Sequence, residues 1–409
     1  MTASDTVSPV APRRRRRQSV RDVIVVGGGM AGAAAALALA RDGLDVTLVE
    51  ARRPAPWVAT DEVDLRVVAL APSSVACLDE LGVWAAVRAA RAQPYRHMHV
   101  WDAENGAVLD IDAADGGHAE MGWIVENRLV QHQLWQALAA AGVHCRCPAT
   151  VADLDVSAGH VAVRLEGGDV LDARVLVAAD GAASPVRRMA GITTRGREYG
   201  QRAVVAHVDT TRPHRETAWQ RFMPGGPLAL LPLDDGRCSV VWSLPDDDAT
   251  RVLALDDAAF CRALSVASDM CLGPVTGSGP RAAFPLRLTL ARDFHRGRVV
   301  LLGDAAHAVH PLAGQGINLG LRDVVELRDV LATAHAAGGD IGAPHVLARY
   351  ARRRRSADTV DALSLDALAR IYAWQAPPLV ALRGLGMRAV DRLSPLKRAL
   401  AAHAAGRDQ

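Results

Sequence analysis

The sequence predicts an α/β fold in which a Rossmann-like nucleotide-binding domain is interrupted by an antiparallel β-sheet and followed by a helical C-terminal segment. Residues 22–50 form a strand, glycine turn, helix and strand pattern, which favours a parallel sheet. Residues 203–244 hold several strand-like runs without helices between them, which favours an antiparallel sheet. From residue 323 the pattern is helical, with breaks at prolines. Nucleotide-binding signals lie on both sides of the antiparallel part, so that domain is expected to be discontinuous.

The expected domain organisation follows from these patterns. The parts are a disordered basic tail (1–20), a cofactor domain (21–92, 125–192 and 295–345), a substrate domain (93–124 and 193–294) and a C-terminal helical segment (346–409).

Composition indicates an ordinary globular protein. The chain has 409 residues, 50% of them apolar, and a net charge of +2, so no global field favours nucleic acid as a partner. The six cysteines are scattered, which predicts free thiols in a reducing cytoplasm. No run reaches the ~18 apolar residues that span a bilayer. We therefore expect a cytoplasmic protein.

The first motif is a G-x-G-x-x-G turn between the strand and the helix. Gly27 permits the tight turn, Gly29 lets the backbone approach a pyrophosphate, and Gly32 lets helix and strand pack closely. Glu50 ends the second strand and can accept hydrogen bonds from a ribose 2′-hydroxyl. Strand, turn, helix and acidic residue together predict dinucleotide binding.

A second motif places Asp180-Gly181 at the end of a strand, followed by a helix that opens with Ser184-Pro185. An ordinary turn with a capped helix explains this pattern equally well. The residues alone leave both interpretations open.

The third motif begins where a buried strand delivers Gly303-Asp304. Asp304 can accept hydrogen bonds from the hydroxyls of a flavin ribityl chain. Gly314 and Gly316 let a loop lie close to a flat ring, and the helix that starts near Ile317 directs its N-terminus at that ring.

Metal binding is not expected at this motif. His307 and His310 are the candidate ligands, but no carboxylate or cysteine stands at a suitable spacing nearby.

These three motifs, in this order, resemble those of the single-component aromatic flavin hydroxylases, the group that includes 4-hydroxybenzoate hydroxylase. Within that group the chain is most similar to the ubiquinone-biosynthesis hydroxylases, from about residue 23 to about residue 406. The segments that carry this similarity are 64–70, 125–128, 131–138, 222–232, 238–244, 284–286 and 303–323.

The resemblance implies FAD as cofactor, with NAD(P)H and O2 as co-substrates. It implies that Arg66 and Arg128 line the FAD pyrophosphate and the flavin entrance, and that Asp180-Gly181 serves both FAD and the nicotinamide donor. The loop at Pro311 would border the oxygen-reacting edge of the flavin, and Asn318, at the start of the helix that follows, is expected to be a cofactor-binding residue.

The implied reaction is hydroxylation of a polyprenylated phenol or quinol through a flavin C4a-hydroperoxide, within ubiquinone biosynthesis and alongside partner proteins of that pathway. The 2-polyprenylphenol 6-hydroxylase branch is the most similar, on residues 238–244, 339–342 and 349–350, while the 3-demethoxyubiquinol 3-hydroxylase branch stays open through residues 219–232. No catalytic acid or base can be assigned, because none of the four tyrosines can be identified as the group that activates a phenol.

Two other functions remain as alternatives. One is an FAD-dependent hydroxylase of an aromatic, polyketide-type secondary metabolite. The other is a flavin-holding scaffold in a biosynthetic complex. A flavin-dependent halogenase is disfavoured, since the eight tryptophans form no W-x-W-x-I-P run.

The C-terminal segment suggests contact with the inner face of the cell membrane. Between residues 379 and 393, apolar residues recur at three- and four-residue steps among arginines. Such a basic amphipathic helix can lie transiently on an anionic lipid surface. The same apolar stripe would also fit packing on the protein or on a partner subunit, and the sequence leaves both interpretations open.

Overall fold

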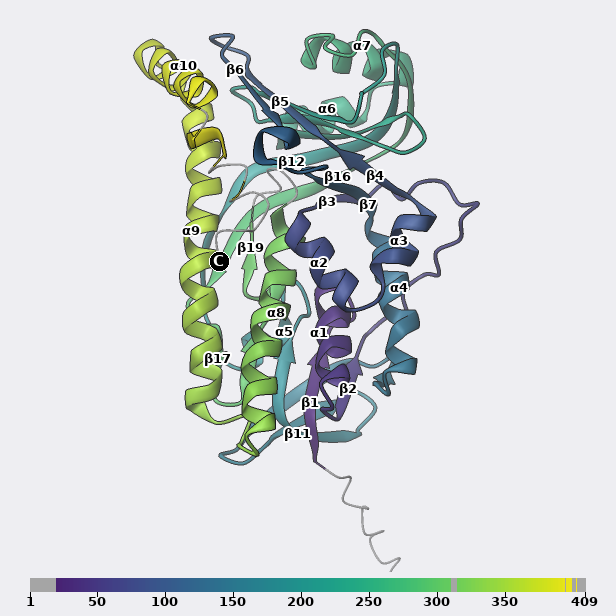
Figure 1. Cartoon of the computed structure of the whole chain (residues 1–409), viewed down its shortest axis with the longest axis vertical. Coiled ribbons are helices and arrows are strands. Elements are labelled where there is room, and N and C mark those ends of the chain that lie inside the picture. The colour runs from purple at the N-terminus through teal and green to yellow at the C-terminus, as the bar shows by residue number, and fades with distance from the viewer. Residues whose placement is uncertain (1–19, 310–314, 394, 399–401, 403–409) are drawn as a thin grey trace, which may run out of the picture.

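The computed structural model describes residues 20–309, 315–393, 395–398 and 402, so nearly all of the expected basic tail lies outside the described residues. One large sheet lies at the lower end of Figure 1 and another at the upper end, with a small three-stranded sheet between them. Two long helices, α8 (Gln315–Ala336) and α9 (Pro344–Ala373), flank the lower sheet, and α9 continues upward towards the upper sheet.

The lower sheet has the parallel centre that the strand–helix–strand pattern predicts. Its main order is β17-β18-β11-β1-β2-β8, with β10 and β9 extending from β11 as antiparallel strands. The strands are β1 (Arg21–Val26), β2 (Val46–Val49), β8 (His144–Arg146), β9 (Val151–Val156), β10 (Val161–Leu165), β11 (Val170–Ala178), β17 (His295–Arg296) and β18 (Val299–Leu301). Because β1 pairs with both β2 and β11, its last residue brings the glycine turn to the centre of the sheet edge.

Three helices pack on one another beside this sheet. They are α1 (Met30–Arg41), α4 (Asn127–Ala140) and α8. The alanines and leucines of α1 are almost completely buried, so the helix is covered on nearly every side. Small alanine side chains allow this close approach between helix and sheet, and the apolar core fixes the start of α1.

The upper sheet is mostly antiparallel, as expected, in the order β19-β16-β12-β15-β14-β13-β5-β6. Its strands are β5 (His97–Asp102), β6 (Val108–Asp112), β12 (Thr194–Thr210), β13 (Thr217–Phe222), β14 (Leu228–Pro232), β15 (Cys238–Pro245), β16 (Val275–Ala291) and β19 (His307–Ala308). One pair departs from the expectation, since β13 and β5 run parallel. The β5–β6 hairpin turns at Asn105-Gly106, where Gly106 has φ +64°, as the Asn-Gly pair predicts.

Shorter elements complete the molecule. The three-stranded sheet joins β3 (Val67–Leu70), β7 (Gly122–Glu126) and β4 (Ala92–Tyr95). The sequence pattern of residues 73–91 predicts one continuous helix, but the structure has two, α2 (Pro72–Glu80) and α3 (Trp84–Ala90), because the chain turns at Gly82 with φ +59°. The remaining elements are α5 (Pro185–Met189), α6 (Asp246–Leu253), α7 (Asp257–Ala267), α10 (Pro377–Arg392) and the 3-10 helices η1 (Ala113–Gly116) and η2 (Gly303–Ala305).

Prolines mark the starts of the last two helices, as predicted. Pro344 opens α9 and Pro377 opens α10, at the first helical position, where a missing N–H costs little. Within the described part of the chain, none of the helices has both the length and the apolarity needed to cross a lipid bilayer.

Candidate functional site

The glycine turn after β1 is shaped by contacts that leave no room for side chains. A Cβ at Gly27 would lie 2.2 Å from the carbonyl oxygen of Ala179, and one at Gly32 would lie 2.0 Å from that of Gly27. Around Gly29 the situation is the reverse, since a Cβ there would meet no atom within 4 Å. Gly29 is exposed at the N-cap of α1, where free N–H groups and the helix dipole favour an anion.

The same turn is held from outside by Glu50, which the motif predicted, and by two side chains that it did not predict. The Gly28 N–H donates to Glu50 Oε2 at 2.5 Å, and Gln131 Nε2 and Trp135 Nε1 donate to the Gly28 carbonyl at 2.7 and 2.8 Å. Gln131 and Trp135 lie on α4, about a hundred residues further along the chain. Their only signal in the sequence was the similarity of the 131–138 segment to a family.

Close contacts bring the three motifs to one place. Ala31 of α1 lies close to two later glycines. A Cβ at Gly303 would lie 3.4 Å from the Cβ of Ala31, and a Cβ at Gly320 would lie 3.3 Å from it. Arg187, in the helix after Asp180-Gly181, donates from Nη1 to the Ala305 carbonyl at 2.7 Å. The start of α1, the η2 turn and the start of α8 therefore form a single continuous surface.

Asp304 lies in η2, between this surface and Arg66. Its side chain remains accessible to solvent although protein atoms surround it densely, and burial raises the pKa of its carboxyl group. The positive charges of His307 and Arg66 oppose that increase. Arg66 also lies over the Phe284 ring, with Cζ 5.5 Å from the ring centroid. An accessible acceptor and an exposed cation thus stand on the same side of the molecule.

Behind η2 lies a network of buried charges. Asp323 of α8 accepts from the Gly303 N–H at 2.8 Å, from His307 Nε2 at 2.7 Å and from Arg354 Nε at 2.7 Å. Arg354 of α9 also donates to Asp358, and Asp358 lies 3.5 Å from His307 Nε2. All four charged side chains are at most 2% exposed. This network fixes the backbone of the turn that carries Asp304.

The carboxylates of the network set its protonation. Burial opposes the charge on His307, but Asp323 and Asp358 prevail and raise the pKa of His307 to about 9. Burial raises the pKa of Asp358 to about 8, and the negative charge of Asp323 adds to that effect. Near neutral pH, Asp323 is ionised, His307 and Arg354 are cationic, and Asp358 is largely protonated. His307, considered above as a metal ligand, does have carboxylates beside it: its ligand atom and those of Asp323 and Asp358 lie within 4.8 Å of one another, although the two acids are far from it in sequence. Arg354 pairs with both of these carboxyl groups.

A second buried carboxylate, that of Glu126, lies close to both predicted arginines along the backbone, since Glu126 pairs with Val67, which follows Arg66, and stands two residues before Arg128. Glu126 accepts from the Asp64 N–H at 2.6 Å, from Trp57 Nε1 at 3.0 Å and from Arg91 Nη1 at 3.1 Å. Glu126 therefore orders the segment that precedes Arg66, and it was missed as a site residue. Arg128 pairs with Asp61 at 3.2 Å, and its buried Nε has no hydrogen-bond partner among the described residues.

The remaining predicted site residues fall into three groups. Gly316 and Ile317 lie in the first turn of α8, and a Cβ at Gly316 would be 4.0 Å from Asp304 Oδ1. The Asn318 side chain is buried and binds the protein, accepting from the Ala71 N–H at 2.9 Å and donating to the Ala69 carbonyl at 2.8 Å. Two predicted residues, Pro311 and Gly314, lie outside the described residues.

The Asp180-Gly181 turn has the capped helix of the simpler interpretation. Asp180 Oδ2 accepts from the Val186 N–H at 3.0 Å, and Ser184 Oγ accepts from the Arg187 N–H at 2.9 Å. Burial raises the pKa of Asp180. Gly181 has φ +83° and open space around its Cα, so the backbone stays approachable there. A cofactor role for this pair remains a prediction.

The geometry fits an FAD molecule. Open space at Gly29, on a helix N-terminus, suits a pyrophosphate, while the accessible Asp304 suits a ribityl chain. Glu50 stands beside the turn, where a ribose is expected, although Gly28 and Arg52 N–H groups already bind its two oxygens. A discontinuous dinucleotide fold with this second sheet defines the class of flavin-dependent aromatic hydroxylases.

Comparisons with known proteins agree with this class. The FAD binding domain family matches residues 21–360. The 3-demethoxyubiquinol 3-hydroxylase of Escherichia coli K12 is 38% identical over 92% of this chain and 96% of its own length. Ubiquinone hydroxylase UbiL of Rhodospirillum rubrum is 36% identical over 99% of this chain and 94% of its own. The crystal structure of p-nitrophenol 4-monooxygenase from Pseudomonas putida shares the fold, with a TM-score of 0.76 at 22% identity, over 95% of this chain and 99% of that one.

The chain belongs to the FAD binding domain family and, within it, to the ubiquinone-biosynthesis hydroxylases. It is an FAD-dependent monooxygenase, as its sequence predicted.

Proposed function

We propose that the protein hydroxylates the aromatic ring of a polyprenylated phenol or quinol in ubiquinone biosynthesis, with NAD(P)H and O2 as co-substrates. The observation that carries this proposal is similarity over almost the whole length to two hydroxylases named for ubiquinone or its precursor. The polyketide-type alternative has only fold-level likeness on its side, at 24% identity or less.

Bound FAD supplies the redox and oxygen chemistry, and this chain's own residues place and shield it. Gly29 and the N-terminus of α1 would hold the pyrophosphate, Glu50 would meet the adenosine ribose, and Asp304 would accept from the ribityl hydroxyls. Asp323 keeps Asp304 in position through the Gly303 N–H. The α8 N-terminus would favour negative charge on the ring system.

The substrate would lie against the face of the upper sheet that is turned away from α6 and α7. Alternate residues of β12 and β15 point to the helix-covered core, including Val204 and Val240. Their neighbours Val205 and Val241 therefore belong to the other face, where the paired residues are Ala203 with Ser243, Val205 with Val241 and His207 with Ser239. These side chains combine two valines with small hydroxyl groups and one imidazole, which suits a phenol ring that carries an apolar substituent.

Isotope labelling tests the proposed reaction. The FAD-loaded protein is incubated with a short-chain prenylphenol, NAD(P)H and 18-O-labelled O2, and the product is examined by mass spectrometry. One labelled oxygen atom in the new hydroxyl group is expected. An unlabelled hydroxyl group, or NAD(P)H oxidation unaffected by the phenol, would contradict the proposal.

Ring position is part of the same proposal. Both branches considered above remain compatible with residues 219–244, and the E. coli relative belongs by name to the 3-hydroxylase branch. We propose that the protein hydroxylates position 3 of a demethoxyquinol. This quinol is therefore the first substrate to test, and a 2-polyprenylphenol is the comparison. Faster turnover of the phenol would assign the 6-hydroxylase branch instead.

A membrane-surface role is proposed for α10. Its inner side packs on the β5–β6 hairpin through a buried Arg383–Asp102 ion pair at 2.6 Å and through Met387. Two leucines of the predicted apolar stripe are on its outer side, where Leu382 is 65% exposed and Leu393, directly after the helix, is 53% exposed. Leu385, which the sequence pattern did not include, is 62% exposed beside them. The stripe therefore faces away from the protein, which favours a lipid surface or a partner protein.

Vesicle binding tests this role without removing the buried ion pair. The double variant Leu382→Glu and Leu385→Glu should lose binding to phosphatidylglycerol vesicles, because charges replace the apolar contact. Val266→Glu, at a 70% exposed apolar residue of α7, is the matched control. Unchanged vesicle binding by the double variant would contradict the membrane-surface role and favour contact of the stripe with a partner protein.

A further inference from the structure

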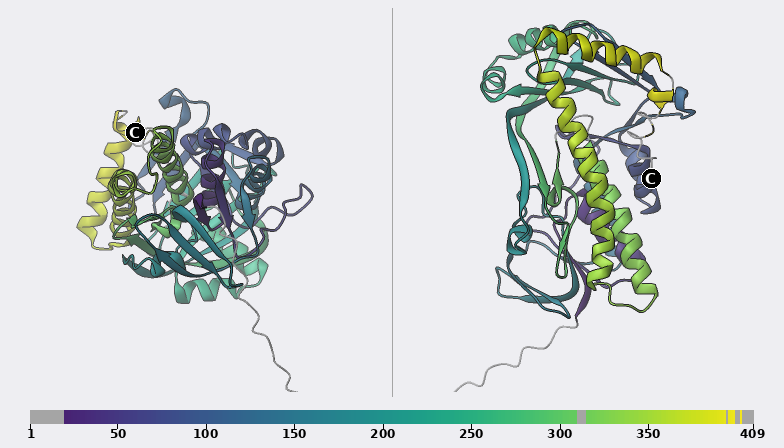
Figure 2. Two further views of the ribbon diagram at one scale, coloured as in Figure 1. Left: turned by 90° about the horizontal axis from the view of Figure 1, so that it is seen from below. Right: turned by 90° about the vertical axis from the view of Figure 1, so that its left-hand side faces the viewer.

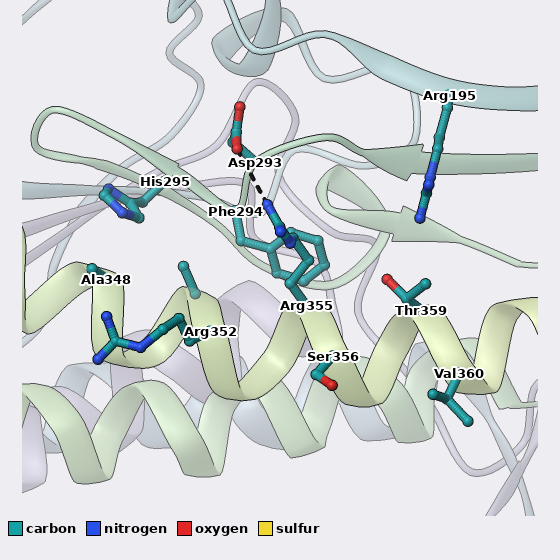
Figure 3. A pocket seen from close by; sticks show the side chains of 11 residues that line it. Arg195, Asp293, Phe294, His295, Ala348, Arg352, Arg355, Ser356, Thr359 and Val360 are labelled. Carbon is teal, nitrogen blue, oxygen red and sulfur yellow. Dashed lines mark hydrogen bonds and ion pairs between the residues drawn. The ribbon is translucent and has the colours of Figure 1, made fainter.

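A cavity of about 510 Å³ opens between α9 and the segment that links β16 to β17 (Figure 3). Three arginines line it, Arg352 and Arg355 from α9 and Arg195 from the start of β12 on the opposite side. None of the residues predicted to bind FAD is among its lining residues. The buried Phe294 lies between this cavity and the charge network behind η2, since the centroid of its ring is 6.1 Å from that of the His307 ring.

The charges in this cavity are unbalanced. Arg195 and Arg352 make no hydrogen bond or ion pair with any residue that the structure describes, whereas Arg355 lies 3.4 Å from Asp293, the one acidic residue in the lining. Neighbouring arginines of α9 do have partners, Arg353 at Glu326 and Arg354 at Asp323. Three guanidinium groups against one carboxylate leave this cavity with an excess of positive charge. Figure 3 shows Arg352 and Arg195 towards its two ends with Arg355 between them, so the cavity suits an elongated, doubly charged anion.

The rest of the lining adds polar and apolar contacts. Ser356 and Thr359 place hydroxyl groups on the same side of α9 as Arg352 and Arg355. Phe294 and Ala351 form an apolar floor. The volume lies in the range of small-molecule sites, which combine an apolar lining with a few directed polar groups.

We propose that this cavity binds an organic phosphate, a phosphate or diphosphate ester whose anionic oxygens bridge Arg195 and the arginines of α9 while its organic part lies on Phe294. Two sources offer this chemistry, a free nucleoside diphosphate and the headgroup of an anionic phospholipid. The site is separate from the proposed FAD site, and it does not depend on the proposed hydroxylation.

Calorimetric titration of the FAD-loaded protein with inorganic pyrophosphate, at constant ionic strength, tests the site. The parent protein should bind, and Arg352→Gln and Arg195→Gln should each weaken binding at least ten-fold. Arg349→Gln removes the same charge from an exposed position of α9 outside the cavity lining and should leave binding unchanged. No binding by the parent, or equal weakening by all three variants, would overturn the proposal.

Competition distinguishes the two sources. Displacement of pyrophosphate by ADP assigns a nucleotide. Displacement of pyrophosphate by a short-chain, water-soluble phosphatidylglycerol, which is lost in Arg352→Gln but kept in Arg349→Gln, assigns a lipid headgroup. If neither ADP nor this lipid competes with pyrophosphate, the assignment to an organic phosphate is wrong.

Discussion

The two ends of the proposed FAD site are built in different ways. At the adenosine end, Gly27 and Gly32 fit against backbone atoms of neighbouring segments, and a nearby carboxylate completes the turn. At the flavin end, Asp304 depends on the buried charges of Asp323 and Arg354, which come from two later helices. The first end is specified by local backbone geometry, while the second depends on long-range electrostatics.

The largest expected effect lies at the flavin end. Replacing Arg354 with methionine removes the guanidinium that binds both buried carboxyl groups and leaves His307 to balance Asp323, which should lower the free energy of unfolding by about 3–5 kcal/mol. Chemical denaturation followed by circular dichroism measures the change. Arg353→Met, one residue earlier and exposed, should leave the unfolding midpoint unchanged. Equal effects of the two substitutions would mean that the buried network has no special role.

Two glycines sharpen the comparison at the adenosine end. Gly32→Ala places a methyl group against the Gly27 carbonyl, so it should destabilise the fold by about 1–3 kcal/mol and lower FAD content. Gly29→Ala meets no protein atom and should keep the fold while losing FAD, because the methyl group enters the space proposed for the pyrophosphate. Unfolding midpoints and bound flavin absorbance separate the two effects. Full FAD content in Gly29→Ala would contradict the proposal that the pyrophosphate lies at this turn.

A more gradual effect, spread over several pH units, is expected from pH. The folded-state pKa of His307 is raised from 6.5 to about 9, so its contribution is complete below 6.5 and is lost as pH rises through 9. The raised pKa of Asp358 acts in the same direction, because between about pH 4 and 8 this group is ionised in the unfolded chain but still protonated in the folded protein. Stability should therefore fall by about 1 kcal/mol per pH unit for each group, with both groups contributing from pH 6.5 to 8 and His307 alone from pH 8 to 9.

Asp358→Asn isolates one of these contributions, because asparagine mimics the protonated acid. Its stability should decline less than that of the parent between pH 6.5 and 8. Parallel pH profiles for the two proteins would contradict the raised pKa of Asp358.

What the sequence could predict follows the same division. The glycine turn, Glu50, the strand that delivers Asp304 and the proline-marked helix starts were all predictable, because each is written in a short segment. Asp323 was visible only as the end of a family-like run. Arg354 and Asp358 gave no signal, since they belong to a long arginine-rich helix whose buried face becomes known only when α9 packs on α8.

The upper sheet shows a similar limit. Alternation predicted its strands, but not the parallel pairing of β13 with β5, which joins segments more than a hundred residues apart. The prediction of a continuous helix over 73–91 was wrong although the sequence holds the signal for the break, because Gly82 is a poor helix former and takes φ +59° directly after the C-cap of α2. Local patterns thus specify element types and breaks, and tertiary contacts decide strand partners.

The measurement that tests the central claim most directly is the affinity of the flavin-free protein for FAD in Asp304→Ala, titrated by quenching of flavin fluorescence. Asp329→Ala, at an exposed carboxylate of α8, is the control. If Asp304 accepts from the ribityl chain on a turn fixed by the buried network, its removal should weaken FAD binding at least ten-fold and leave the unfolding midpoint unchanged. An FAD dissociation constant equal to that of the parent protein would contradict this account of the flavin end.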